Sequence, residues 1–139
     1  MPDHDDLQPL LKELTDVAIE ECIRVKQLDD FALPFMLQTG REGTSLTVVT
    51  GPTKHAVQSA REDIRAQAAQ LDAYVIAYDG TLKSRDGGDL EAFILECGEK
   101  PQQEGFVFFQ RYTHDESGAL VLVVGSGSLL RRTEQLLGS

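Results

Sequence analysis

Leu90-Glu-Ala-Phe-Ile-Leu-Glu-Cys97 is a short, mostly apolar run that has the length and composition of a β-strand. Three further runs of this kind flank it, at residues 73–79, 106–112 and 119–124. Glycine-containing turn segments separate them, among them His114-Asp-Glu-Ser-Gly118. Several runs lack strict alternation, which is typical of a sheet covered on both faces over part of its length. The second half of the chain therefore predicts an antiparallel meander of four strands.

The first half of the chain alternates helical and strand patterns. Apolar residues recur at three- and four-residue steps from residue 7 to residue 25, which predicts an amphipathic helix of about twenty residues. Two β-prone runs, 31–38 and 44–50, predict a hairpin, in which Pro34 makes the first strand an edge or delays its start. A second helix is expected from Thr53 to about residue 72, and a short amphipathic helix at 129–137.

These elements predict one domain over residues 1–139, with the order α-β-β-α-β-β-β-β-α. We expect a two-layer α+β fold with a mostly antiparallel sheet. The apolar positions expected in the core are Leu14, Ala18, Val48, Val57, Ile64, Ile76, Phe93, Leu95, Phe108, Leu120 and Leu122.

The charge of the chain argues against two classes of partner. The formal net charge is -10, and the first 30 residues contribute -6 of it, from nine acidic and three basic side chains. Nucleic-acid binding relies on lysine and arginine, so we expect no nucleic-acid partner. No apolar run is long enough to span a bilayer, and the N-terminus lacks a secretory signal pattern. With two widely separated cysteines, the sequence predicts a cytoplasmic protein with reduced thiols and no membrane contact.

One group of carboxylates is a candidate metal site. Asp79, Asp89 and Glu96 lie at the ends of two strands expected to be neighbours, where their oxygens could converge on a divalent cation. The arrangement resembles the PD-(D/E)xK nuclease pattern, which implies a metal-dependent hydrolase. The sequence departs from that pattern because Gly98 stands at the lysine position and Lys100 comes two residues late.

Other catalytic patterns are weaker. The histidines at positions 4, 55 and 114 lie beside no serine or cysteine in a nucleophile-elbow setting, and they show no zinc-ligand spacing with the two cysteines. The glycine-containing turns at 50–54 and 125–128 do not fit a phosphate-binding loop. We therefore expect no cofactor.

Three segments of the C-terminal half carry a family resemblance: Ala77-Tyr-Asp-Gly-Thr81, residues 89–96 and Phe108-Phe-Gln-Arg-Tyr112. Together they resemble a group of small bacterial proteins of unassigned function. The resemblance covers about 35 residues. It implies a cytoplasmic bacterial protein and says nothing about activity.

These observations lead to a principal functional hypothesis and an alternative. The principal hypothesis is a non-catalytic protein-interaction or regulatory module, because no nucleophile–base pair or cofactor motif stands out. We expect a homodimer, and a protein partner is also possible, with the contact on the first helix through Leu7, Leu10 and Leu14. The alternative is a divalent-metal-dependent hydrolase that uses Asp79, Asp89 and Glu96.

Overall fold

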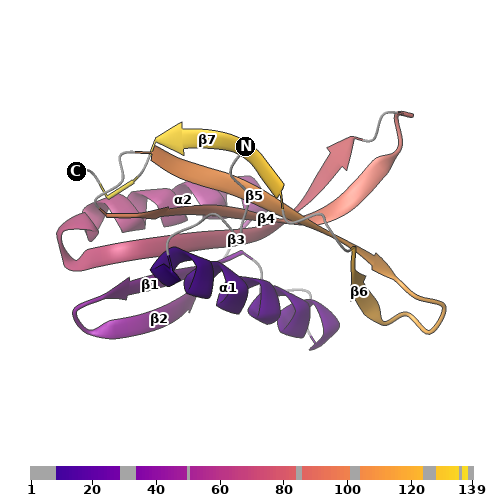
Figure 1. The fold of residues 1–139 in the computed structure, drawn as a ribbon, viewed down its shortest axis with the longest axis horizontal. Helices are drawn as coiled ribbons and strands as arrows, with labels where there is room; N and C mark the ends of the chain where they lie inside the picture. The colour runs from indigo at the N-terminus through magenta and orange to yellow at the C-terminus, as the bar shows by residue number, and fades with distance from the viewer. Residues whose placement is uncertain are drawn as a thin grey trace.

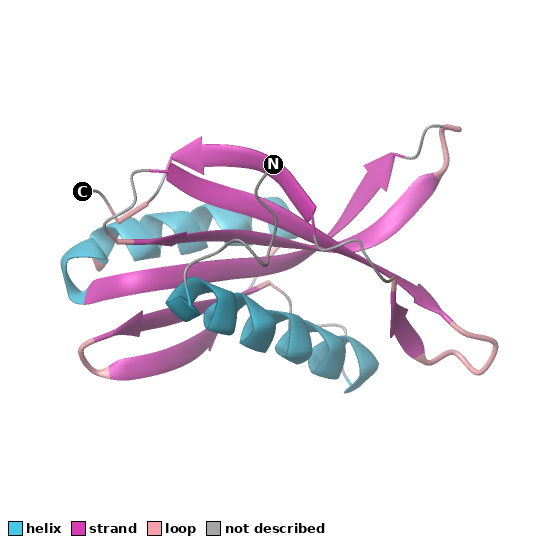
Figure 2. Ribbon diagram, viewed as in Figure 1, coloured by secondary structure: helices cyan, strands magenta, loops and turns pink. Residues whose placement is uncertain are grey.

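A computed structural model of the chain describes residues 9–28, 34–49, 51–83, 86–100, 104–123, 128–134 and 136–137. These residues form two α-helices and one sheet, and Figure 2 shows that the sheet is long and curled. The elements in chain order are α1 (Pro9–Leu28), β1 (Phe35–Gly40), β2 (Gly43–Val48), α2 (Thr53–Ala66), the 3-10 turn η3 (Ala68–Gln70), β3 (Leu71–Lys83), β4 (Asp89–Glu99), β5 (Glu104–His114), β6 (Leu120–Leu122) and β7 (Ser128–Glu134).

All the described strands join one antiparallel sheet in the order β2-β1-β3-β4-β5. The last two strands share the outer edge of β5: β7 pairs with its first half and β6 with its end. The predicted α+β class with a mostly antiparallel sheet is confirmed. Strand β1 begins at Phe35, directly after Pro34, as the missing proline N–H predicted, and it lies inside the sheet rather than at an edge.

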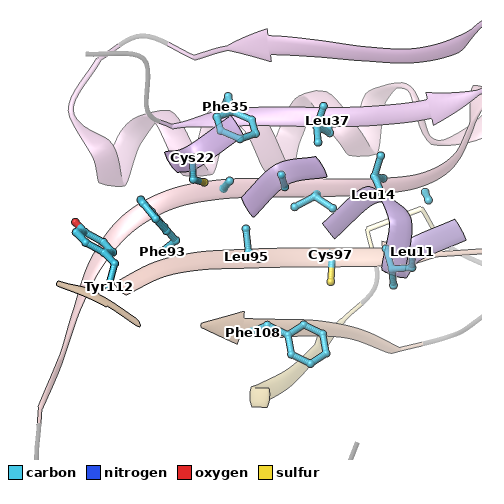
Figure 3. Packing of buried hydrophobic residues seen from close by; sticks show 14 residues of the cluster. Leu11, Leu14, Cys22, Phe35, Leu37, Phe93, Leu95, Cys97, Phe108 and Tyr112 are labelled. Carbon is cyan, nitrogen blue, oxygen red and sulfur yellow. The ribbon is translucent and has the colours of Figure 1, made fainter. Parts of the chain in front are cut away.

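The two helices lie on opposite faces of the sheet (Figure 1). Helix α1 packs on one face, and the buried cluster there includes small residues of the helix, Ala18 and Cys22, and of β3, Ala73 and Ala77. Figure 3 shows the larger side chains of this cluster, with Phe35 and Leu37 of β1 beside α1. Helix α2 packs on the other face over β1 and β3. The sheet is therefore covered on both sides, and the arrangement has three layers instead of the two expected.

The final element is a correction to the sequence analysis. Residues 128–134 form strand β7 against β5, where a helix was expected over 129–137. A helix of nine residues is marginal by itself, whereas strand pairing satisfies the backbone of both β7 and the first half of β5. Leu137, after the strand, is buried against the α2 cluster.

Most of the predicted core positions are buried: Leu14, Ala18, Val57, Ile64, Ile76, Phe93, Leu95 and Phe108. Leu120 and Leu122 of β6 are half-buried at the margin of the α1 cluster. Val48 is 44% exposed, so its prediction as a core residue is wrong. It lies on β2, which has one neighbouring strand, β1, among the described strands.

Within the described ranges, neither helix combines the length and the apolar character that crossing a membrane requires.

Candidate functional site

Asp79 lies on the α1 face of the sheet and is held by two side chains from distant parts of the chain. Lys26, in the last turn of α1, places its Nζ 2.8 Å from one carboxylate oxygen. The hydroxyl of Tyr112 on β5 donates to the other oxygen at 2.5 Å. The carboxylate thus already has a cationic partner and a phenol donor. This cluster ties the end of α1 to β3 and β5.

Aromatic side chains continue from this cluster toward the end of β5. The ring of Phe93 stacks on Tyr112 with centroids 4.4 Å apart, and His114 meets Tyr112 edge-on at 5.9 Å. His114 Nδ1 is 3.8 Å from a carboxylate oxygen of Glu91. A hollow of about 170 Å³, below the usual size of a small-molecule site, lies beside Asp79, and a larger one of about 470 Å³ is lined by Lys26, His114 and the β5–β6 turn.

Glu96 lies on the opposite face of the sheet, under α2. Arg61 of α2 binds it with two nitrogens: Nε is 2.8 Å from Oε1 and Nη2 is 2.5 Å from Oε2. The hydroxyl of Tyr78 donates to Oε2 at 2.7 Å. The Glu96 side chain is only 7% exposed. Its oxygens are therefore engaged in a buried ion pair that fixes α2 to β4.

The third carboxylate of the predicted metal site stands apart from both. Asp89, at the start of β4, is exposed and pairs with Lys83 across the β3–β4 hairpin. The register sets Asp79 opposite Phe93, and Glu96 is three residues further along β4, so the two carboxylates lie on opposite faces. The structure does not bring the three together, and no three His, Cys, Asp or Glu side chains in the described segments are placed to hold a metal ion.

The two cysteines are buried thiols in the α1 cluster. Burial raises the pKa of both Cys22 and Cys97 well above that of a free thiol, and nearby carboxylates raise it further. A thiol that stays protonated is a poor nucleophile and a poor metal ligand. Both cysteines therefore act as small core residues.

Strand β2 is the most exposed strand of the described sheet. Each of its residues is exposed, and it carries no charged side chain. It ends the sheet order, so only β1 pairs with it among the described strands. Leu46 and Val48 are 41% and 44% exposed and lie opposite Leu37 and Phe35, hence on the α1 face.

The backbone of β2 has hydrogen-bonding groups on its outer side, away from β1, its one partner among the described strands. The N–H of Val49 donates to the carbonyl of Pro34 at 3.0 Å. Because N–H and C=O groups alternate in direction along a strand, those of Thr44, Leu46 and Val48 point away from β1. Natural edge strands are usually protected by lysine, proline or a bulge, and β2 has none of these.

Helix α1 adds exposed apolar residues on the side facing β2. Leu10 and Val17 are 40% and 42% exposed. Leu10 and Val17 each come one position before a buried residue of the helix, whereas Lys26 comes one position after a buried residue. Because successive residues are rotated around the helix axis, Leu10 and Val17 lie on one flank of the helix and Lys26 lies on the other. Lys26 points toward β5, because it shares the Asp79 carboxylate with Tyr112. The flank with Leu10 and Val17 therefore faces β1 and β2.

No protein-family model, curated protein or solved structure matches this chain.

The partner-contact residues expected from the sequence have different locations. Leu10 is exposed, but Leu14 is buried against the sheet and cannot contact a partner. Leu7 lies outside the described residues. Strand β2 was expected as part of a hairpin and not as a contact surface, although the run from Gly43 to Val49 contains no charge and no proline, which is the signal of an unprotected edge.

Proposed function

We propose that this chain is a non-catalytic protein-interaction module whose interaction surface is the outer edge of β2. The observation that carries the proposal is the combination found on one strand: exposed backbone donors and acceptors, exposed apolar side chains at Leu46 and Val48, and no charge. Such an edge binds a further strand through main-chain hydrogen bonds, while its alternate side chains select the partner. The exposed Leu10 and Val17 enlarge the apolar area on the same side.

The polar clusters support a structural role better than a catalytic one. The carboxylates of Asp79 and Glu96 are each bound by a cation and a tyrosine hydroxyl that come from other elements. An ion pair that joins a helix to the sheet fixes the relative position of the two. The hydrolase alternative needs these carboxylates to share one metal ion, and their places on opposite faces do not favour it.

We also propose a cytoplasmic location. Both cysteines are free and buried, a state that suits a reducing compartment. The resemblance to small bacterial proteins points the same way.

The test compares partners that co-purify with the full chain and with two lysine variants. Leu46→Lys places a charge in the middle of β2, whereas Val121→Lys makes the same kind of change at an equally exposed apolar residue of β6. We expect the wild type and Val121→Lys to retain the same partner, a second copy included, and Leu46→Lys to lose it. Equal partner recovery by all three proteins would contradict the proposal, as would a wild-type chain with no partner at all.

A further inference from the structure

We infer that the strand bound by β2 is β2 of a second copy of this chain, paired antiparallel about a two-fold axis centred on Leu46. The inference rests on the proposed function, since it assigns an occupant to the same edge. Three features of the strand favour this occupant: its backbone groups, its charge and its position relative to α1.

The outward backbone groups of β2 are self-complementary. Thr44, Leu46 and Val48 present both an N–H and a C=O outward, at every second residue. When the axis passes through Leu46, Leu46 pairs with its own copy and Thr44 pairs with Val48 of the second copy. This register overlaps the whole uncharged run from Gly43 to Val49, so no outward group of the strand is left without a counterpart.

Charge favours this place of contact over the rest of the surface. Two chains of net charge -10 repel each other, and a contact between acidic surfaces adds to that repulsion. From Gly43 to Val49 there is no charged side chain, so the strand pairing itself sets no carboxylate against another. Threonine and valine on neighbouring strands also suit a cross-strand pair.

Because of the position of α1, this pairing joins the exposed apolar residues of β2 and of α1 in one interface. Antiparallel strands related by a two-fold axis keep the same faces of both sheets on one side, so both α1 helices lie on the side of Leu46 and Val48. The flanks with Leu10 and Val17 then face each other across the joined strands. A single foreign strand covers Leu46 and Val48 but brings no helix of its own toward Leu10 and Val17.

The β2 edge alone is smaller than the interface of a typical stable dimer. Stable two-fold interfaces bury about 800 Å² per partner, roughly 20–30 residues on each side. The uncharged run of β2 supplies fewer residues than that, so in the proposed dimer the remaining area has to come from the α1 flank. We therefore expect Leu46→Lys to dissociate the dimer and Leu10→Glu to weaken it to a smaller extent.

The first experiment measures the mass of the purified full chain by sedimentation at about 0.15 M salt, where charges are screened over about 8 Å. Wild type and Val121→Lys are expected at twice the 15.3 kDa chain mass, and Leu46→Lys and Leu46→Pro at the chain mass with unchanged circular dichroism. Proline at this position removes an outward N–H without touching the bonds to β1. A wild-type monomer would overturn the inference, as would a dimer that Leu10→Glu dissociates and Leu46→Lys does not.

The second experiment tests the register on a chain that keeps its native edge. In the proposed pairing the two copies of residue 46 are about 5.5 Å apart at Cα, which a disulfide can span. The two copies of residue 44 are offset by four positions, on the order of 13 Å, which it cannot. Mild oxidation should therefore link Leu46→Cys into dimers and leave Thr44→Cys unlinked. The opposite result, or equal linking of both, would overturn the inferred pairing.

The outcomes separate this inference from the proposed function. A monomeric wild type whose protein partner is lost in Leu46→Lys overturns the self-pairing and leaves β2 as an interaction edge. A dimer whose mass and partners are insensitive to Leu46→Lys and Leu46→Pro overturns both.

Discussion

Arg61 and Glu96 form a two-point ion pair between α2 and β4, with nitrogen–oxygen distances of 2.8 and 2.5 Å. The glutamate side chain is 7% exposed and the arginine 30%. The bond to Glu96 raises the pKa of Arg61 above its ordinary value, so the guanidinium stays charged. Because α2 covers β1 and β3 as well, this pair helps to fix the helix over the half of the sheet that leads to β2.

Removal of the arginine should therefore cost more than removal of an ordinary surface charge. Arg61→Ala leaves a buried carboxylate without its cation, and we expect a loss of about 3 kcal/mol in the free energy of unfolding. Arg65→Ala, an exposed arginine of the same helix, should change it by less than about 0.5 kcal/mol. Urea titration monitored by circular dichroism measures both.

A double substitution separates the pair from its members. The double variant Arg61→Met with Glu96→Met leaves no buried charge. Its loss in unfolding free energy should therefore be smaller than the sum of the losses caused by Arg61→Met alone and Glu96→Met alone. Strict additivity of the two losses would mean that the ion pair contributes no coupling.

Glu99, at the end of β4, predicts a dependence of stability on pH. Burial raises the pKa of its carboxyl above the ordinary value. The folded state therefore disfavours ionisation of Glu99. The resulting loss of unfolding free energy begins as the pH rises through the unfolded-state pKa, about 4.3, and is complete above the folded-state pKa. Below about pH 4 both states are protonated and the cost vanishes.

Glu99→Gln should remove this pH dependence. The variant's gain in unfolding free energy over the wild type should be smallest near pH 3.5 and should grow toward pH 7. Thr113→Ala, a non-titrating change at an exposed position of β5, should give a difference that does not vary with pH. Denaturant titrations at several pH values test this, and a gain that shrinks with rising pH would refute the assignment.

The two native thiols should be inert in the folded protein. Cys22 and Cys97 are both fully buried, and burial keeps their pKa values high. A thiol reagent such as dithiobisnitrobenzoate should react on the order of 100-fold more slowly with the native chain than with the chain in urea. Val121→Cys, on the exposed side of β6, should add one fast-reacting thiol. Fast reaction of a native cysteine would show that the α1 cluster opens readily.

The sequence was sufficient to predict the element types that local pattern controls. The long apolar period of α1 and the β-prone runs of β3, β4 and β5 appear in the structure close to their expected places. Residues 129–137 differ because a leucine-rich tail of that length fits a helix or a strand, and only the open edge of β5 decides between them.

The functional surfaces depended on contacts that the sequence pattern does not contain. Asp79 and Glu96 looked like neighbours because both were expected at strand ends, but β3 and β4 continue past them and the register places them on opposite faces. Lys26 and Arg61, which neutralise them, lie 53 and 35 positions away along the chain. Val48 was expected in the core because a short edge strand and a short inner strand have the same composition, so the sequence pattern does not separate them.

Gly40 and Gly80 allow a comparison of two close approaches in the sheet. A Cβ added at Gly40 would lie 2.1 Å from the backbone oxygen of Gln70 and 3.3 Å from the Cα of Leu71, whereas at Gly80 it would lie 2.7 Å from Cγ1 of Ile94. A side chain can rotate away, but the η3–β3 junction at Gln70 is backbone and must move as a whole. Gly40→Ala should therefore cost more than Gly80→Ala.

We expect Gly40→Ala to lower the unfolding free energy by about 2–3 kcal/mol and Gly80→Ala by about 1 kcal/mol. Because Gly40 ends β1 where it turns into β2, the strain should also separate this end of the hairpin from β3. Hydrogen exchange followed by mass spectrometry should then show faster exchange of the β1–β2 amides in Gly40→Ala but not in Gly80→Ala. If β2 is the interaction edge, dimer formation should weaken in the first variant and persist in the second. Equal exchange and equal association in both variants would mean that the contact of Gly40 with Gln70 does not position the edge.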